Sequence, residues 1–386
     1  MGRAKKGCGC AAAVLVIIMA AAGLVGWKFF WPRWKAQPQA ASGGELQVHV
    51  LDVGPINGDS ILIVSPTGKT VLIDAGDAGK EKVVLDALKR YKIQQLDYFI
   101  GTHPHPDHLG AAAAVIKAVK VLNIIDNGLE PAGQPSPTPT PAAGKTAPKT
   151  PAPKPPARGA KKLKGPTQFY DDYREAVKQS GAHYETAEVG KKYDLGGGAR
   201  LTILGPSQPW FTKEQMKAGG NEPNANSVVT RLDYGDFSLL FTGDAEEQTE
   251  QRMLAKDLEL AAKILKVAHH GSKYATSDGF LRRVQPEVAI ISDGEWNHYG
   301  HPAQAVLDRL KAANAKLYRT DLQGEITITT TGKLKGDKLY EIKTAKEAKS
   351  DLWTGRPPQK DDASRSGFIA YGDFGPPPKV KTEKPK

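Results

Sequence analysis

The residues best suited to chemistry gather in one short segment, Thr102-His103-Pro104-His105-Pro106-Asp107-His108. Its imidazole and carboxylate groups are the side chains that bind zinc, manganese or iron in proteins. So many polar groups cannot face a core without partners. The segment follows a predicted buried strand at 97–102 and precedes a predicted helix at 109–119, and α/β folds hold ligands at such strand ends. The pattern predicts a metal site, and two His/Asp groups in one loop suit two neighbouring ions.

Residues of the same types recur in four other short motifs. They are Asp74 in the run LIDAG, Asp244 in FTGD, the adjacent pair His269 and His270 in KVAHHGS, and His301 in the pattern Asn-x-Tyr-Gly-His-Pro. The two cysteines of the chain, Cys8 and Cys10, lie near its N-terminus, so no thiolate serves a metal site in the body of the chain.

In combination these motifs resemble the metallo-β-lactamase superfamily. The runs at 266–272 and 297–302 resemble the branch that includes the hydrolase domain of ComEC-type competence proteins and the choline-phosphate esterases of cell-wall teichoic acid. The resemblance covers about residues 46–332. It implies an α/β fold, the αββα four-layer sandwich, in which two mixed sheets lie between helices and the metals lie at one edge. It also implies two divalent metal ions, with Zn²⁺ as the first expectation and Mn²⁺ as the alternative.

The resemblance also implies a set of metal ligands. The first ion would be bound by His103 and His105, the second by Asp107, His108 and His270, and Asp244 would bridge both. A bridging carboxylate offsets the repulsion between two dications. For Asp74 two interpretations stay open, since it either orients a ligand histidine or simply forms a turn before Gly76.

One departure from the superfamily pattern concerns the first ion. Many members supply another histidine just before the strand that leads to the bridging aspartate, whereas residues 221–227 contain none here. An asparagine in this loop, Asn224 or Asn226, would donate to a substrate oxyanion or belong to an ordinary polar loop. We expect Asn226 to act with Asp244 and His269 in catalysis, with His269 contacting the substrate or its leaving group. His301 is either a donor at the rim or part of a helix start.

The function implied is hydrolysis by a metal-bound hydroxide, most readily of a phosphodiester in nucleic acid or in a cell-envelope polymer. A β-lactamase or thioester hydrolase is less expected, because those branches use the histidine that is absent. The alternative from another class is a membrane-tethered binding or assembly protein with a non-catalytic metal site. The sequence leaves the oligomeric state unknown.

The N-terminal 35 residues are expected to form a membrane anchor. The stretch from Gly7 to Trp27 is uncharged and about 20 residues long, enough to span a bilayer as a helix. Aromatic residues of the type found at membrane interfaces follow it, in the run WKFFWPRW. A cleaved signal peptide is the alternative. We expect an anchored protein of the bacterial cell envelope, with its catalytic domain outside the cytoplasm.

The positive charge of the chain is concentrated in segments that cannot bury apolar surface. Residues 1–45, 131–166 and 343–386 carry +5, +7 and +4 of the formal net charge of +11, which leaves −5 for the rest. The Pro/Ala/Lys/Thr composition of 131–166 predicts a disordered insertion, and 343–386 is expected to be a disordered tail. These segments suit contact with a polyanion better than the folded body does.

The body alternates between predicted strands and helices. Strands are expected around 46–54, 60–65 and 70–76, at 97–102, and at 316–319 and 325–330. Helices are expected at 80–91, 109–119, 168–180, 245–256, 277–283 and 302–313.

Overall fold

The computed structural model describes residues 44–54, 57–131, 167–216, 221–295 and 299–356. The expected membrane anchor at 1–35, almost all of the insertion at 131–166 and the end of the tail lie outside these residues. Within the described residues, no helix is both long and apolar enough to cross a membrane.

The first sheet has eight strands in the order β15-β14-β1-β2-β3-β4-β5-β6. The strands β1 to β3 form an antiparallel meander, and β3 to β6 run parallel. The bounds are β1 Leu46–Val50, β2 Ile61–Val64, β3 Thr70–Ile73, β4 Gln95–Ile100, β5 Lys120–Asp126, β6 His183–Thr186, β14 Ile326–Thr330 and β15 Glu341–Thr344.

The second sheet has seven strands in the order β13-β12-β11-β10-β9-β8-β7. Its strands β10 to β13 are parallel, so their carboxyl ends lie at one edge, and β7 to β10 are antiparallel. The bounds are β7 Lys192–Gly196, β8 Ala199–Gly205, β9 Val229–Tyr234, β10 Phe237–Phe241, β11 Ile264–Lys266, β12 Val288–Ile291 and β13 Lys316–Arg319.

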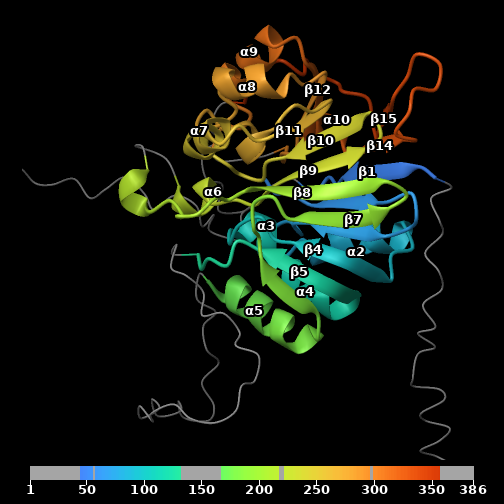
Figure 1. The fold of residues 1–386 in the computed structure, drawn as a ribbon, viewed down its shortest axis with the longest axis vertical. Coiled ribbons are helices and arrows are strands. Elements are labelled where there is room, and N and C mark those ends of the chain that lie inside the picture. Colours follow the sequence, from blue (N-terminus) through green and yellow to red (C-terminus); the bar gives the residue numbers. More distant parts are fainter. Residues whose placement is uncertain (1–43, 55–56, 132–166, 217–220, 296–298, 357–386) are drawn as a thin grey trace, which may run out of the picture. The chain divides into compact units, whose positions relative to one another are not determined.

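Three apolar clusters account for the layers. Alternate residues of a strand face opposite sides of its sheet. In β1, Val48 and Val50 join a cluster that contains residues of both sheets, including Leu239 and Phe241. The other faces pack against helices, α2, α4 and α5 on the first sheet and α7, α8 and α9 on the second (Figure 1). The predicted αββα sandwich is therefore confirmed for the described residues.

The predicted helices are present, with ends that differ from the prediction by a few residues. The α-helices are α2 Glu81–Arg90, α3 Pro106–Leu109, α4 Ala112–Ala118, α5 Gln168–Ser180, α6 Glu222–Ala225, α7 Glu247–Ala255, α8 Asp278–Val284, α9 Gln304–Ala312 and α10 Thr320–Gln323. The short 3-10 helices are η1 Lys213–Gln215 and η2 Ala268–Gly271.

The expectation of a disordered tail from residue 343 is wrong for 343–356. Strand β15 pairs antiparallel with β14, and Ile342 packs on the cluster between the sheets. Beyond it, the buried Arg319 guanidinium donates to the carbonyls of Leu352 and Thr354, at 2.9 and 2.8 Å. The composition of this segment is typical of a tail, but pairing with an existing strand orders it.

Candidate metal centre

The loop that carries the central motif is fixed where β4 ends. Its helix α3 begins with Pro106, a residue favoured at the first helical position because it lacks an N–H. The Ala75 N–H donates to the carbonyl of His108 at 2.8 Å, and the Asp59 N–H donates to that of Asp107 at 3.2 Å. Backbone bonds thus tie the histidine-rich loop to the loops that follow β3 and precede β2.

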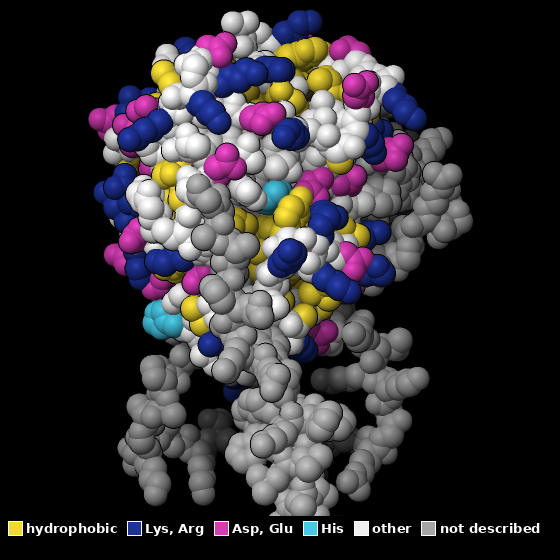
Figure 2. Space-filling model, turned by 90° about the vertical axis from the view of Figure 1, so that its right-hand side faces the viewer, with side chains coloured by type: hydrophobic (Ala, Val, Ile, Leu, Met, Phe, Trp, Pro, Cys, Tyr) yellow, Lys and Arg dark blue, Asp and Glu magenta, His cyan; other side chains and the backbone are white. Residues whose placement is uncertain are grey.

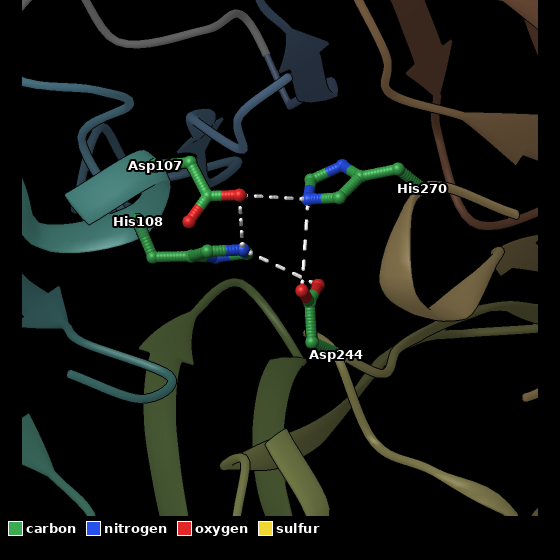
Figure 3. Close-up of side chains that lie close together, drawn as sticks. All are labelled: Asp107, His108, Asp244 and His270. Atoms are coloured by element: carbon green, nitrogen blue, oxygen red, sulfur yellow. Dashed lines mark ion pairs between the residues drawn. The ribbon is translucent and has the colours of Figure 1, made fainter. Parts of the chain in front are cut away.

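Four side chains from three loops converge beside this edge (Figure 3). The ligand atoms of Asp107, His108, Asp244 and His270 all lie within 4.8 Å of one another. His108 Nε2 is 3.2 Å from Asp244 Oδ1, and His270 Nε2 is 3.3 Å from Asp107 Oδ2 and 3.6 Å from Asp244 Oδ2. These residues follow β4, β10 and β11, so the fold brings together both halves of the sandwich.

The atoms that face one another in this cluster fit a metal ion. The buried atoms His108 Nε2, His270 Nε2 and Asp244 Oδ1 have no hydrogen-bond partner. Buried polar atoms rarely lack a hydrogen-bond partner, because each unpaired atom costs its desolvation energy. The Nδ1 atoms are occupied: that of His108 lies 2.7 Å from Asp74 Oδ2, and that of His270 donates to the carbonyl of Ser292 at 2.8 Å. Each Nδ1 bond turns the Nε2 lone pair toward the cluster, as in histidine metal ligands.

Asp74 is fully buried and orients its surroundings. Besides His108, its carboxylate accepts from the Thr102 backbone N–H and the Thr102 hydroxyl, both at 2.7 Å. Its backbone has a positive φ of 57°, a region that non-glycine residues seldom adopt. Of the two interpretations left open by the sequence, the contacts favour the one in which Asp74 orients His108.

His103 and His105 form a second pair beside the cluster. His103 Nε2 lies 3.0 Å from His105 Nδ1 and 3.9 Å from Asp244 Oδ2. The Nδ1 of His103, which is fully buried, lies 3.0 Å from the Thr102 hydroxyl and 3.3 Å from that of Ser227. Asp244 therefore lies between the two groups of histidines, which is the place of a bridging carboxylate.

The adjacent residues His269 and His270 diverge because of their backbone conformation. They do not lie on a strand; both have left-handed backbone conformations, with φ of 50° and 51°, in η2 after β11. His270 is buried, whereas the His269 side chain is 19% exposed and contacts the ring of His301 edge-on, with centroids 5.3 Å apart. His301 thus lies beside His269.

The expectation that Asn226 contacts substrate is wrong. Asn226 is fully buried, its amide oxygen accepts from the Phe211 N–H, and its amide nitrogen donates to the carbonyls of Phe211 and Glu222. It holds the loop after β8. Its neighbour Asn224 instead places its amide nitrogen 3.2 Å from His269 Nε2. Both asparagines belong to the polar segment 221–227, so the sequence pattern could not distinguish them.

The two groups of histidines differ electrostatically in the metal-free protein. Burial lowers the pKa of His105 to about 4 and that of His103 well below its usual value. Burial also acts against the charged form of His270, but the nearby carboxylates of Asp244 and Asp107 raise its pKa to about 9. For His108 the opposition of burial is likewise overcome, by Asp244 and Asp74, and its pKa is raised. A bound cation would replace the protons that these carboxylates stabilise on His108 and His270.

Sequence reasoning missed three buried residues around the centre. Asp59 and Lys266 form an ion pair behind His270, with Oδ2 and Nζ 2.8 Å apart. Burial raises the pKa of Glu246, which accepts from the Asn221 N–H at 2.8 Å, to about 7. Lys266 begins the KVAHHGS motif and Glu246 follows FTGD, whereas Asp59 lies outside the recognised motifs. No spacing in the sequence predicts their partners, since the partners come from distant segments.

The sequence of this chain is similar to those of several known proteins. A sequence model of the metallo-beta-lactamase superfamily matches residues 53–198, which include the histidine-rich loop. Residues 53–198 are therefore similar to a metallo-β-lactamase domain. The similarity of the chain to ComEC-type competence proteins is confirmed by curated relatives. "ComE operon protein 3" of Bacillus subtilis is 28% identical over 306 residues, 75% of this chain and 33% of that protein.

Two further relatives give the same result. "Competence protein ComA" of Neisseria gonorrhoeae is 28% identical over 75% of this chain and 33% of its own length, and "Recombination protein 2" of Haemophilus influenzae is 29% identical over 73% and 28%. The chain therefore corresponds to about a third of each relative. Solved structures that resemble it include the metallo-beta-lactamase fold protein YhfI of Bacillus subtilis, with 12% identity, 71% of this chain and 96% of that chain covered, and a TM-score of 0.42.

Proposed function

We propose that this protein is a dinuclear metal-dependent hydrolase that acts on phosphodiesters. The observation that carries the proposal is the convergence of four residues whose ligand atoms lie within 4.8 Å of one another. Three atoms of this cluster, His108 Nε2, His270 Nε2 and Asp244 Oδ1, are buried and lack a hydrogen-bond partner. A cluster of this kind is costly without a cation. Divalent ions held there would activate a water molecule for attack and neutralise charge on the substrate oxygens.

Each nearby residue has a role in this proposal. Asp107, His108 and His270 hold one ion, His103 and His105 hold the other, and Asp244 is shared. Zn²⁺ is the ion we expect first, since imidazole and carboxylate suit it, and Mn²⁺ is the alternative. His269 is partly exposed beside the cluster and is the residue we expect to donate to the substrate or its leaving group.

Two lines favour a phosphodiester over other hydrolase substrates. The motifs at 266–272 and 297–302 resemble a branch that includes choline-phosphate esterases, and loop 221–227 lacks the histidine of other branches. Relatives named for competence and recombination favour nucleic acid among the diesters. The competing function is a membrane-tethered binding or assembly protein with a non-catalytic metal site.

Elemental analysis and substrate turnover together test the proposal. The purified full-length protein should contain close to two Zn²⁺ or Mn²⁺ per chain and hydrolyse bis-p-nitrophenyl phosphate, with slower or no action on a phosphomonoester, a β-lactam and a thioester. The control is Asp244→Asn, which keeps the shape of the bridging residue and removes its charge. Two bound ions without turnover of any diester, including oligonucleotides and poly(glycerol phosphate), would favour the binding-protein alternative.

A further inference from the structure

A buried ion pair lies behind the candidate metal centre. Lys266 ends β11, and Asp59 lies in the loop before β2; each is 1% exposed. Lys266 Nζ is 2.8 Å from Asp59 Oδ2 and donates to the carbonyl of Val267 at 2.9 Å. Burying two charges costs solvation energy, and burying two apolar side chains in their place would not. Stability alone is therefore a weak explanation for this ion pair.

The pair contacts a candidate ligand from each half of the sandwich. Asp59 Oδ1 has no hydrogen-bond partner and lies 3.6 Å from His270 Nδ1. The Asp59 N–H donates to the carbonyl of Asp107 at 3.2 Å. His270 and Asp107 are the two residues whose ligand atoms meet across the centre at 3.3 Å. Asp59 therefore contacts both His270 and Asp107, the two residues whose direct contact a bound metal ion would replace.

The surroundings of Asp59 leave little room for adjustment. At Gly58, a Cβ atom would lie 2.8 Å from the carbonyl oxygen of Asp107, closer than such atoms approach in proteins. The Gly58 carbonyl accepts from the Ser292 hydroxyl at 2.9 Å, and the Ser292 carbonyl accepts from His270 Nδ1. The loop before β2 thus touches Asp107 on one side and, through Ser292, His270 on the other.

The neighbouring acidic atoms do not form another metal site. Ligand atoms of Asp59, Asp74 and His108 also lie within 4.8 Å of one another. However, the Lys266 ammonium is already bound to Asp59, and the Asp74 carboxylate already accepts from His108 Nδ1 and Thr102. A fixed ammonium group takes the position that a cation would need beside Asp59.

We propose that Lys266 and Asp59 are positioning residues for the metal that Asp107, His108 and His270 hold, an inference that rests on the proposed function. Lys266 holds Asp59 Oδ2, which keeps Oδ1 at 3.6 Å from His270 Nδ1 and leaves the shorter bond to Ser292. Without the ammonium, the carboxylate turns toward His270, draws its ring away from the Ser292 carbonyl and misdirects Nε2. The pair thereby sets the affinity of one metal site without touching the ion.

Metal titration of two variants tests this role. Zn²⁺ is titrated into metal-free full-length protein in competition with a chromophoric chelator, and the melting temperature of the metal-free protein is measured alongside. In Lys266→Met, one of the two sites should bind Zn²⁺ roughly 10–100-fold more weakly, the range for residues that support metal ligands. Asp59→Asn/Lys266→Met leaves no unpaired charge, so its melting temperature should return toward the wild-type value. Its metal affinity should stay low, because the amide oxygen, no longer held by Lys266, still accepts from His270 Nδ1 in place of the Ser292 carbonyl.

A matched control comes from a second buried pair. Arg319 and Asp321 are joined at 2.7 Å, are both almost fully buried, and have no contact with a candidate metal ligand among the described interactions. Arg319→Met should lower the melting temperature without weakening either metal site.

The possible outcomes separate the two proposals. If the double variant recovers its metal affinity together with its stability, the pair has a structural role alone and the inference is wrong, while the proposed function stands. If Lys266→Met does not fold, the double variant decides. If the wild-type protein binds no metal, the proposed function and the inference both fail.

Discussion

At the residue scale, the left-handed turn after β11 gives two identical side chains different environments. His269 and His270 adopt the same unusual backbone conformation, and strained conformations of this kind cluster at functional sites. The turn buries His270 among Asp107, Asp244 and Ser292, and leaves His269 partly exposed. The adjacent pair in KVAHHGS thus combines a candidate ligand with a candidate substrate contact.

Single substitutions should separate these two roles. His270→Ala removes a ligand, so metal content should fall toward one ion per chain, and excess metal should restore part of the activity. His269→Ala should keep both ions and lose roughly a hundredfold in turnover, the usual effect of deleting one transition-state donor. Elemental analysis and diester kinetics measure both. Metal loss in His269→Ala with retention in His270→Ala would reverse the assignment.

The metal-free protein should have a pH-dependent stability to which two of these histidines contribute in opposite directions. The folded pKa of His270 is raised from its usual 6.5 to about 9, so its contribution is complete below pH 6.5 and is lost as the pH rises through 9. The folded pKa of His105 is lowered to about 4, so its contribution is present above pH 6.5 and is lost as the pH falls through 4. These two residues therefore favour maximum stability near pH 6.5.

Thermal melts of the metal-free protein between pH 4 and 9.5 measure this effect. His270→Asn should flatten the alkaline side of the profile and leave the acidic side unchanged. Metal-loaded protein should lose less stability above pH 6.5, because bound cations replace the proton on His270. A wild-type melting temperature that stays constant from pH 6.5 to 9 would contradict the raised pKa.

At the element scale, the sequence predicted much of the fold because its apolar periodicity is strong. Helix α5 has the predicted bounds, 168–180, and strand β13 likewise matches 316–319. Strand β15 was missed because its residues, Glu341–Thr344, alternate between exposed and half-buried. The sequence of such an edge strand is similar to that of a charged tail. The positions of Asn226 and Lys266 depend on contacts between distant segments, which no local pattern encodes.

Truncation of the C-terminal segment should reveal what β15 and the residues after it contribute. Ending the chain after Arg356 should leave the melting temperature unchanged. Ending it after Tyr340 removes β15 and the carbonyls that accept from the Arg319 guanidinium. Each hydrogen bond to a charged group contributes about 1.5–3 kcal/mol, and a domain of this size shifts by about 2–4 °C per kcal/mol. We expect a loss of at least roughly 6 °C, with equal metal content in both truncated chains.

At the scale of the whole molecule, positive charge and the candidate metal centre belong to different parts of the chain. On the face drawn in Figure 2, Lys and Arg side chains alternate with Asp and Glu instead of forming one basic patch. The insertion at 131–166 carries +7, whereas the chain without its three basic segments carries −5. If a polymeric anion is the substrate, the insertion is therefore the segment expected to attract it.

Deleting residues 132–164 tests this division. The segment has no apolar periodicity, and closing a shorter or longer surface loop changes the free energy little. Metal content and hydrolysis of bis-p-nitrophenyl phosphate should therefore stay close to wild type. Activity on a polymeric diester should fall at low salt and match the wild type at high salt, because screening removes the attraction that the insertion supplies. The matched control keeps the length of the insertion and replaces its seven basic residues by glutamine. If this control behaves as wild type while the deletion loses polymer activity at every salt concentration, the length of the insertion matters and its charge does not.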